Sequence, residues 1–338
     1  MDARTGFRFQ GIGNRPVFDI APFSSRMVSA YQDRRGRTHL FTDRIDHDRR
    51  TAFDLVIDSF DADIAYYTSD DLKTFVDHGL VAVKGVWRGK AEASDLDCIG
   101  CASPAVAVAG RHVLLFYAGR GPCDPAGPFI RSTGLPQLPG RIMLASADND
   151  ESGAPCGRFV KQGPVTDYAA SWRAVRHDDP CAVVDGDRIY LFYKAISWHR
   201  SDRKRVIGLA IGRVDDPFGP YAMHPTPVLV TDPDGETPRV FKVGKTWHMF
   251  FLRTKSQAQT RGRVYEHYTT DDPTRWTLID DKVYESASAV PGQGAPDMCP
   301  IWKPFCEGPP EMAFSVRLDE SDGRLKQWLW KIERKARE

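Results

Sequence analysis

The feature that most constrains this chain is an internal repeat of apolar strand, glycine turn and aromatic-rich strand. The pattern is clearest in three stretches, at Ser103–Tyr117, Asp179–Tyr193 and Thr237–Phe251. Each has a proline near its start, where a strand tolerates the missing N–H, and a glycine at the turn, where a positive φ is often needed. Self-similarity of this kind indicates a fold built from repeated copies of one unit.

A second pattern accompanies these hairpins and consists of a strand, an Asp-containing turn and an aromatic residue. Tyr66–Phe75 and His267–Trp276 are two examples. The Asp side chain holds such a turn by bonding to the backbone that follows it. Together the two patterns give a unit of four short strands that recurs at a spacing of roughly 60 residues.

Radial repetition of four-stranded sheets gives a propeller, which leaves only short sheet edges exposed. We therefore expect an all-β chain that forms a single five-bladed β-propeller domain over residues 1–338. A β-sandwich also has regular short strands and is the alternative, but the strand pairs and turns recur in the same order, which favours the propeller. Leu325–Ile332 is expected to be a final strand rather than a helix, and an N-terminal strand could complete the last blade. The expected blades are at about 24–85, 100–165, 178–230, 236–285 and 294–338.

Composition excludes several classes of function. The 338 residues carry 46 Lys and Arg against 45 Asp and Glu, which gives no electrostatic reason to expect nucleic acid or an anionic membrane as a partner. The apolar runs are too short to span a bilayer. The first residues show no secretory h-region, and the odd number of cysteines, seven, favours reduced thiols in the cytoplasm. Cys98 and Cys101 have CxxC spacing without a second pair or nearby histidines, so we expect no metal and no cofactor.

The start of the first strand of each propeller unit is expected to lie at the mouth of the central channel. Asp179 and Glu236 take equivalent places there in neighbouring units, and Ser103 takes that place in the preceding unit. Two carboxylates that face one pocket suit glycoside hydrolysis, because one must protonate the leaving oxygen while the other activates water or attacks the sugar. Acidic residues before proline can also simply shape turns, but their matched positions favour function.

The sequence here resembles the five-bladed β-propeller glycosidases, especially glycoside hydrolase family 43 and its relatives, over roughly residues 60–285. The most specific segments are Asp179-Pro180 leading to Asp185-Gly186, and Glu236-Thr237-Pro238. The resemblance implies a glycosidase that acts on a small furanoside or pyranoside, with inversion. It also implies that Glu236 is the general acid, and that Asp179 tunes the pKa of Glu236 and holds the sugar.

The general base of that family is an Asp that opens the first blade, and the sequence departs from the family at this point. The corresponding strand offers Ser24 and Ser25. Asp19, just upstream, is our first candidate for the base, and Asp297 is the second. The departure leaves open a non-hydrolytic enzyme, such as a transferase or lyase, or a sugar-binding protein on the same propeller.

The remaining candidates lie near the two carboxylates in the sequence and are expected to bind the carbohydrate. A proton-carrying histidine and cationic side chains among them suggest a substrate with a carboxylate or phosphate group. Nothing in the sequence predicts an oligomeric state. The expected substrate-binding residues are His177, Asp178, Arg176, Trp198, His199 and Ser103.

Overall fold

The structure is a computed structural model, and the regular elements in its described residues are β-strands. No helix in the described part of the chain is long and apolar enough to cross a membrane. The structure describes residues 7–13, 15–46, 62–85, 96–121, 140–170, 172, 176–196, 205–230, 235–254, 263–285, 298–319 and 321–334.

The strands form antiparallel meanders in which neighbours in the sequence pair with one another. One meander contains β2 (Ser24–Gln32), β3 (Thr38–Ile45), β4 (Ala62–Ser69) and β5 (Val76–Ala82). The next contains β6 (Gly100–Ala109), β7 (His112–Arg120), β8 (Gly140–Asn149) and β9 (Pro155–Pro164). A third contains β10 (Arg176–Asp185), β11 (Arg188–Ile196) and β12 (Arg205–Arg213), with β13 (Ala222–Met223) and β14 (Leu229–Val230) on β12. A fourth contains β15 (Gly235–Val243), β16 (Thr246–Thr254), β17 (Arg263–Thr270) and β18 (Thr277–Glu285).

The last meander joins the two ends of the chain. It contains β19 (Met298–Trp302), β20 (Met312–Asp319), β21 (Arg324–Arg334) and β1 (Phe7–Ile12). β1 pairs antiparallel with β21 over its whole length, from Phe7 opposite Arg334 to Ile12 opposite Leu329. The expected final strand and its N-terminal partner are therefore confirmed.

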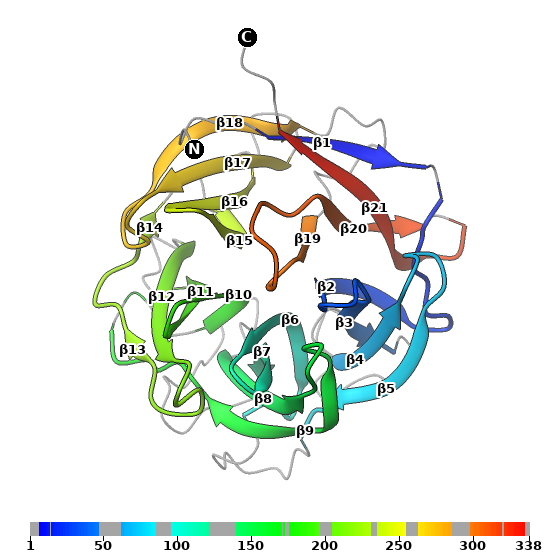
Figure 1. Ribbon diagram of the computed structural model, residues 1–338, viewed down its shortest axis with the longest axis horizontal. Coiled ribbons are helices and arrows are strands. Elements are labelled where there is room, and N and C mark those ends of the chain that lie inside the picture. Colours follow the sequence, from blue (N-terminus) through cyan, green and yellow to red (C-terminus); the bar gives the residue numbers. More distant parts are fainter. Residues whose placement is uncertain are drawn as a thin grey trace, which may run out of the picture.

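The meanders are arranged around one axis, with β2, β6, β10, β15 and β19 innermost (Figure 1). This radial arrangement is that of a β-propeller. Buried aromatic rings fill the space between neighbouring meanders, as where Phe7 of β1 packs edge-on against Phe250 of β16 with ring centroids 5.4 Å apart.

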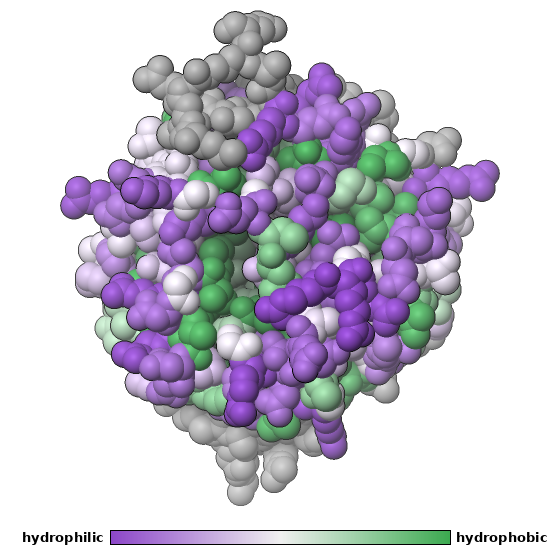
Figure 2. Space-filling model, in the orientation of Figure 1, coloured by the Kyte–Doolittle hydropathy of each residue, from purple (hydrophilic) through white to green (hydrophobic). Residues whose placement is uncertain are grey.

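Side chains close the central axis part of the way along it. The cavity between Val28, Ala105, Cys181 and Arg239 measures only about 10 Å³, room for about one water molecule. A cavity of about 360 Å³ opens beyond this constriction, at the ends of the innermost strands, and its apolar wall is visible near the centre of Figure 2. The two ends of the axis are therefore separate sites.

A β-bulge interrupts β2, β6, β10 and β15 close to the N-terminal end of each strand. In three of the four strands the bulge includes a proline, and the residue before it has a positive φ. Residues before proline are normally extended, so this backbone is strained. The three residues are Ser103 (φ 53°), Asp179 (φ 46°) and Thr237 (φ 53°).

The bulges correct the expected equivalence of the two carboxylates. Ser103 and Asp179 do take matching places, but the matching residue in β15 is Thr237, not Glu236. Glu236 corresponds to Asp178, because each of these two pairs across the hairpin just before its bulge. The sequence comparison was therefore wrong by one residue at Glu236, which stands two places before its proline.

Thr237→Gly tests this backbone strain. The side-chain hydroxyl of Thr237 is buried and has no hydrogen-bond partner within the described residues, so little is lost with it. We expect the variant to keep the parental stability, because relief of roughly 1 kcal/mol of left-handed strain offsets the entropy that glycine adds to the unfolded chain. Thr277→Gly on β18 lacks that relief and should lose about 0.5–1 kcal/mol in urea unfolding. Equal losses in both variants would contradict the idea of strain.

Candidate functional site

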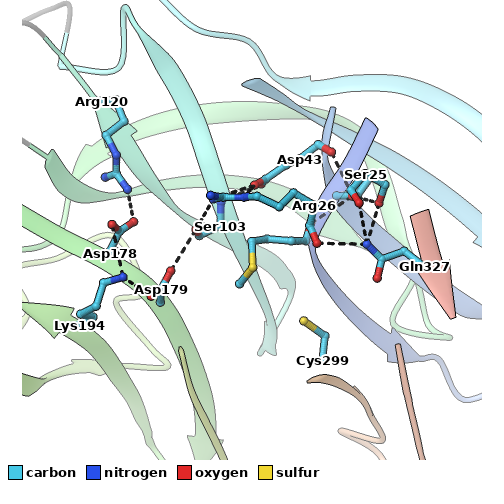
Figure 3. A network of polar contacts seen from close by, with 12 residues as sticks. Ser25, Arg26, Asp43, Ser103, Arg120, Asp178, Asp179, Lys194, Cys299 and Gln327 are labelled. Atoms are coloured by element: carbon cyan, nitrogen blue, oxygen red, sulfur yellow. Dashed lines mark hydrogen bonds and ion pairs between the residues drawn. The ribbon is translucent and has the colours of Figure 1, made fainter. Parts of the chain in front are cut away.

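A connected group of charged side chains lies where β2, β10 and β15 begin and where β3, β7 and β11 end (Figure 3). Hydrogen bonds and ion pairs join its members across four meanders, with Ser103 of β6 as a link between the first and the third. We call this group the mouth cluster. Its charged members are Arg26, Asp43, Arg120, Arg176, Asp178, Asp179, Lys194, Arg205 and Glu236.

Lys194 of β11 joins the two carboxylates that sequence analysis singled out. Its Nζ lies 2.5 Å from Oδ2 of Asp179 and 3.1 Å from Oε2 of Glu236. These two oxygens are therefore no more than about 6 Å apart, less than the roughly 6.5–9.5 Å between the carboxyl groups of inverting glycosidases. Burial acts most strongly on the pKa of Lys194 and lowers it, but the surrounding carboxylates outweigh burial and raise that pKa overall. The ammonium group consequently stays charged.

Glu236 is the most exposed carboxylate of the mouth cluster. Its side chain is 15% exposed, against 7% for Asp179 and 0% for Asp43. Nη1 of Arg205, the first residue of β12, lies 2.9 Å from the oxygen of Glu236 that also meets Lys194. A ligand at the mouth would therefore reach Glu236 before the other acidic groups.

Asp178 and Arg176 do not fit the substrate-binding role expected for them. The guanidinium groups of Arg120 and Arg176 both form close ion pairs with the carboxylate of Asp178, whose side chain is only 2% exposed. Burial alone would raise the pKa of Asp178, but the two arginines and Lys194 outweigh it and hold the pKa well below its ordinary value. The group is a buried ion pair that stabilises the start of β10.

The side chain of His177 points away from the mouth cluster, and its expected role as proton carrier stays a prediction. Its side chain is fully buried, with Nδ1 2.7 Å from Oγ1 of Thr166 and its ring centroid 5.0 Å from that of Tyr193. Successive side chains of a strand point to opposite faces. His177 therefore packs between strands while Asp178 joins the mouth cluster.

Ser103 does lie in the cluster and links three of its members. Its Oγ donates to Oδ1 of Asp179 at 3.3 Å and lies 3.4 Å from Nη2 of Arg26. Its backbone N–H donates to Oδ1 of Asp43 at 2.7 Å. The first meander therefore contributes an arginine from β2 and, behind it, a fully buried aspartate from β3. Burial raises the pKa of Asp43 to about 6, although Arg26 opposes the shift.

Asp19 belongs to a different group of charges. Its carboxylate contacts Arg324 at 2.5 Å and Lys326 at 3.2 Å, both on β21 near the outside of the last meander (Figure 1). Its role as general base stays a prediction. The other candidates, Asp297, Trp198 and His199, lie outside the described residues.

The cysteines of the CxxC pair are buried thiols, and the Sγ of Cys101 lies 3.5 Å from Oδ2 of Asp97. Within the described residues, His, Cys, Asp and Glu form no group of three or more that could hold a metal ion.

Sequence analysis missed the cations that hold the carboxylates, namely Arg26, Arg120, Lys194 and Arg205. A signal was present for two of them. The aromatic second strands Leu115–Tyr117 and Leu191–Tyr193 are each followed by a basic residue within three positions, Arg120 and Lys194. A basic residue at the end of a repeated strand predicts a partner for the acids that open the strand beside it.

Comparison with known proteins reveals the fold only. No family model matches the sequence, and no curated protein matches it. Among solved structures, the chain is similar to Zg3597, a family 117 glycoside hydrolase from the marine bacterium Zobellia galactanivorans, with a TM-score of 0.67 and 18% identity over 98% of this chain and 91% of that one. It is also similar to a structure from the GH130 family of mannoside phosphorylases and glycoside hydrolases (TM-score 0.64, 11% identity, 97% and 94% covered). A third is the Bombyx mori GH32 β-fructofuranosidase BmSUC1 (TM-score 0.58, 16% identity, 95% and 62% covered). The chain therefore shares the propeller fold of glycoside hydrolases.

Asp178→Asn tests the structural role of the buried ion pair. Removing one partner leaves buried guanidinium groups without a full counter-charge, which typically costs about 3–5 kcal/mol. We expect a loss of that size in urea unfolding at pH 7. The pKa of Asp178 is lower in the folded chain than in the unfolded one, so its stabilisation exists above about pH 4 and is lost as the pH falls. The difference from the parent should therefore shrink in acid.

The matched control is Asp215→Asn, which removes one partner of an exposed ion pair with Arg213. We expect no measurable change in its unfolding midpoint, because water screens exposed pairs. If both variants unfold at the parental urea concentration, the buried pair is not structural.

Proposed function

We propose that residues 1–338 form one five-bladed β-propeller domain that cleaves the glycosidic bond of a small glycoside. The five blades would be the meanders that begin with β2, β6, β10, β15 and β19, with β1 completing the last. The similarity in fold to glycoside hydrolases supports this proposal, but function resides in the site and must be argued there.

The observation that carries the proposal is the pair of carboxylates on Lys194. Asp179 and Glu236 come from neighbouring innermost strands and meet the same ammonium group at 2.5 and 3.1 Å. Glu236 would donate a proton to the leaving oxygen as the bond to the anomeric carbon breaks, and Asp179 would hold the sugar and set the charge around the acid. Lys194 and Arg205 would keep Glu236 pointed at that oxygen. Both cations favour the ionised carboxylate, so Glu236 would take up a proton from solvent before each cleavage.

The closed axis supports a small substrate bound at its end. Because the constriction leaves only about 10 Å³, a glycoside cannot pass through the channel and must enter and leave by the mouth. Exo-acting cleavage of a terminal sugar fits entry from one end of the axis only.

The separation of the carboxylates bears on the stereochemistry. The sequence resemblance implied inversion, which needs a base roughly 6.5–9.5 Å from the acid. Asp179 and Glu236 are closer together than that, so inversion would require another base such as Asp19, and retention would require Asp179 to act as the nucleophile. The configuration of the first-formed sugar, followed by ¹H NMR, distinguishes the two outcomes.

Glu236→Gln tests the acid role. Glutamine has nearly the same shape but cannot supply the carboxylic proton, so kcat on an unactivated glycoside should fall roughly 10²–10⁴-fold. An activated aryl glycoside should lose less, because its leaving group needs little protonation. Unchanged kcat on the unactivated substrate would contradict the proposal.

Asp19→Asn is the companion variant for the base. If Asp19 activates water in an inverting reaction, turnover should be abolished while sugar binding persists, and azide or formate should restore part of the rate. If Asp19 serves only its ion pairs on β21, turnover should be retained.

A further inference from the structure

The first meander places an arginine where its neighbours place small polar or acidic residues. The bulge of β2 lies between Ser25 and Val28, as those of β6 and β10 lie around Ser103 and Asp179. Arg26 therefore takes the place in β2 that Asp179 takes in β10. A guanidinium group stays protonated at any physiological pH and accepts no hydrogen bond, so it cannot act as the base expected from the first blade.

The structure holds this arginine firmly at the mouth. Nε and Nη2 of Arg26 lie 3.3 Å from the carboxylate of Asp43, whose side chain is fully buried. Nη2 also lies 3.4 Å from Oγ of Ser103, so the side chain reaches from β2 across to β6 (Figure 3). The side chain of Arg26 nevertheless remains 23% exposed. Asp43 therefore acts as a positioning residue for a cation that a ligand can reach.

The guanidinium group of Arg26 is accessible to an anion at the mouth. Asp178 is already shared by two arginines, while Asp179 and Glu236 share Lys194. Arg26, on β2, stays partly exposed beside these ion pairs. An oxyanion at the mouth would meet its exposed side. Arginine is suited to this because its planar group matches carboxylate and phosphate oxygens.

The order of contacts indicates where such an anion would lie relative to the acid. Ser103 connects Arg26 to Asp179, and Lys194 connects Asp179 to Glu236. Asp179 therefore stands between the arginine and the acid. A sugar above Asp179, with its leaving oxygen at Glu236, would present its opposite side to Arg26.

We infer that Arg26, held by Asp43 and Ser103, forms an oxyanion subsite on the side of Asp179 away from Glu236. The inference rests on the proposed function and specifies its substrate class. The oxyanion could be a carboxylate carried by the sugar itself. It could instead be inorganic phosphate that acts as nucleophile. In that case a phosphate oxygen bonds to the anomeric carbon, the glycosidic C–O bond breaks, and the leaving alcohol takes its proton from Glu236, which gives a sugar 1-phosphate.

Isothermal titration calorimetry with inorganic phosphate, glucuronate and neutral glucose tests the subsite without requiring turnover. The wild-type chain should bind phosphate or glucuronate more tightly than glucose. Arg26→Met should weaken that binding by about tenfold or more, the usual worth of a charge-assisted hydrogen bond. Arg213→Met removes an exposed arginine of β12 and should leave binding unchanged. Because the titration measures binding without turnover, failure of the acid role and failure of the subsite are distinguishable.

The arms of the experiment separate the two sources of the oxyanion. If phosphate binds, and if cleavage of a neutral glycoside requires phosphate and yields a sugar 1-phosphate, then the oxyanion is a phosphate that acts as the nucleophile. If glucuronate binds, and if glucuronides are cleaved at the same rate with and without phosphate, then the oxyanion is a carboxylate substituent of the substrate. If Arg26→Met fails to fold, Arg26→Lys takes its place as the test variant. It keeps the charge without the planar group and should bind the anion more weakly than the wild type does. The inference is overturned if the wild type binds neither anion. It is also overturned if a folded Arg26→Met or Arg26→Lys variant binds the anion as tightly as the wild type does.

Discussion

The attraction between Lys194 and the carboxylates around it is the interaction on which the rest of the site depends. Asp179 and Glu236 come from different innermost strands, and like charges at this spacing repel each other. One ammonium group in contact with both lets the two strands approach. The same lysine pairs across the hairpin with Asp178, so the position of β11 sets the distance between the proposed acid and its partner.

Much of the fold was predictable because it follows local rules of the chain. The repeat from Asp179 to Tyr193 predicted a hairpin, and the structure has β10 and β11 there with Gly186 at a φ of 62° in the turn. Alternating apolar side chains and a glycine at the turn suffice for such a unit. The closing pair of β1 and β21 followed from the same pattern at the two ends of the chain.

The site was less predictable because its geometry depends on contacts between units. Glu236 and Asp179 were treated as equivalent, yet they stand one residue out of register, as their different distances from Pro238 and Pro180 already indicate. Arg205 begins a strand without any turn or motif to mark it. His177 looked available beside two acids, but the alternation of the strand turned it towards Thr166 and Tyr193. Side-chain direction in a bulged strand is a property of the assembled sheets.

The pairing of β1 with β21 has a consequence for how the protein is made. Phe7–Ile12 is synthesised long before its partner in the sheet, Arg324–Arg334, because four meanders lie between them in the sequence. At usual rates of translation this strand waits on the order of half a minute for a partner. Until then Phe7 and Phe9, buried in the finished protein, are exposed to any other strand edge nearby. The ring closes only after Arg324–Arg334 has been synthesised, so a chain interrupted before that segment would leave the edge of β1 unpaired.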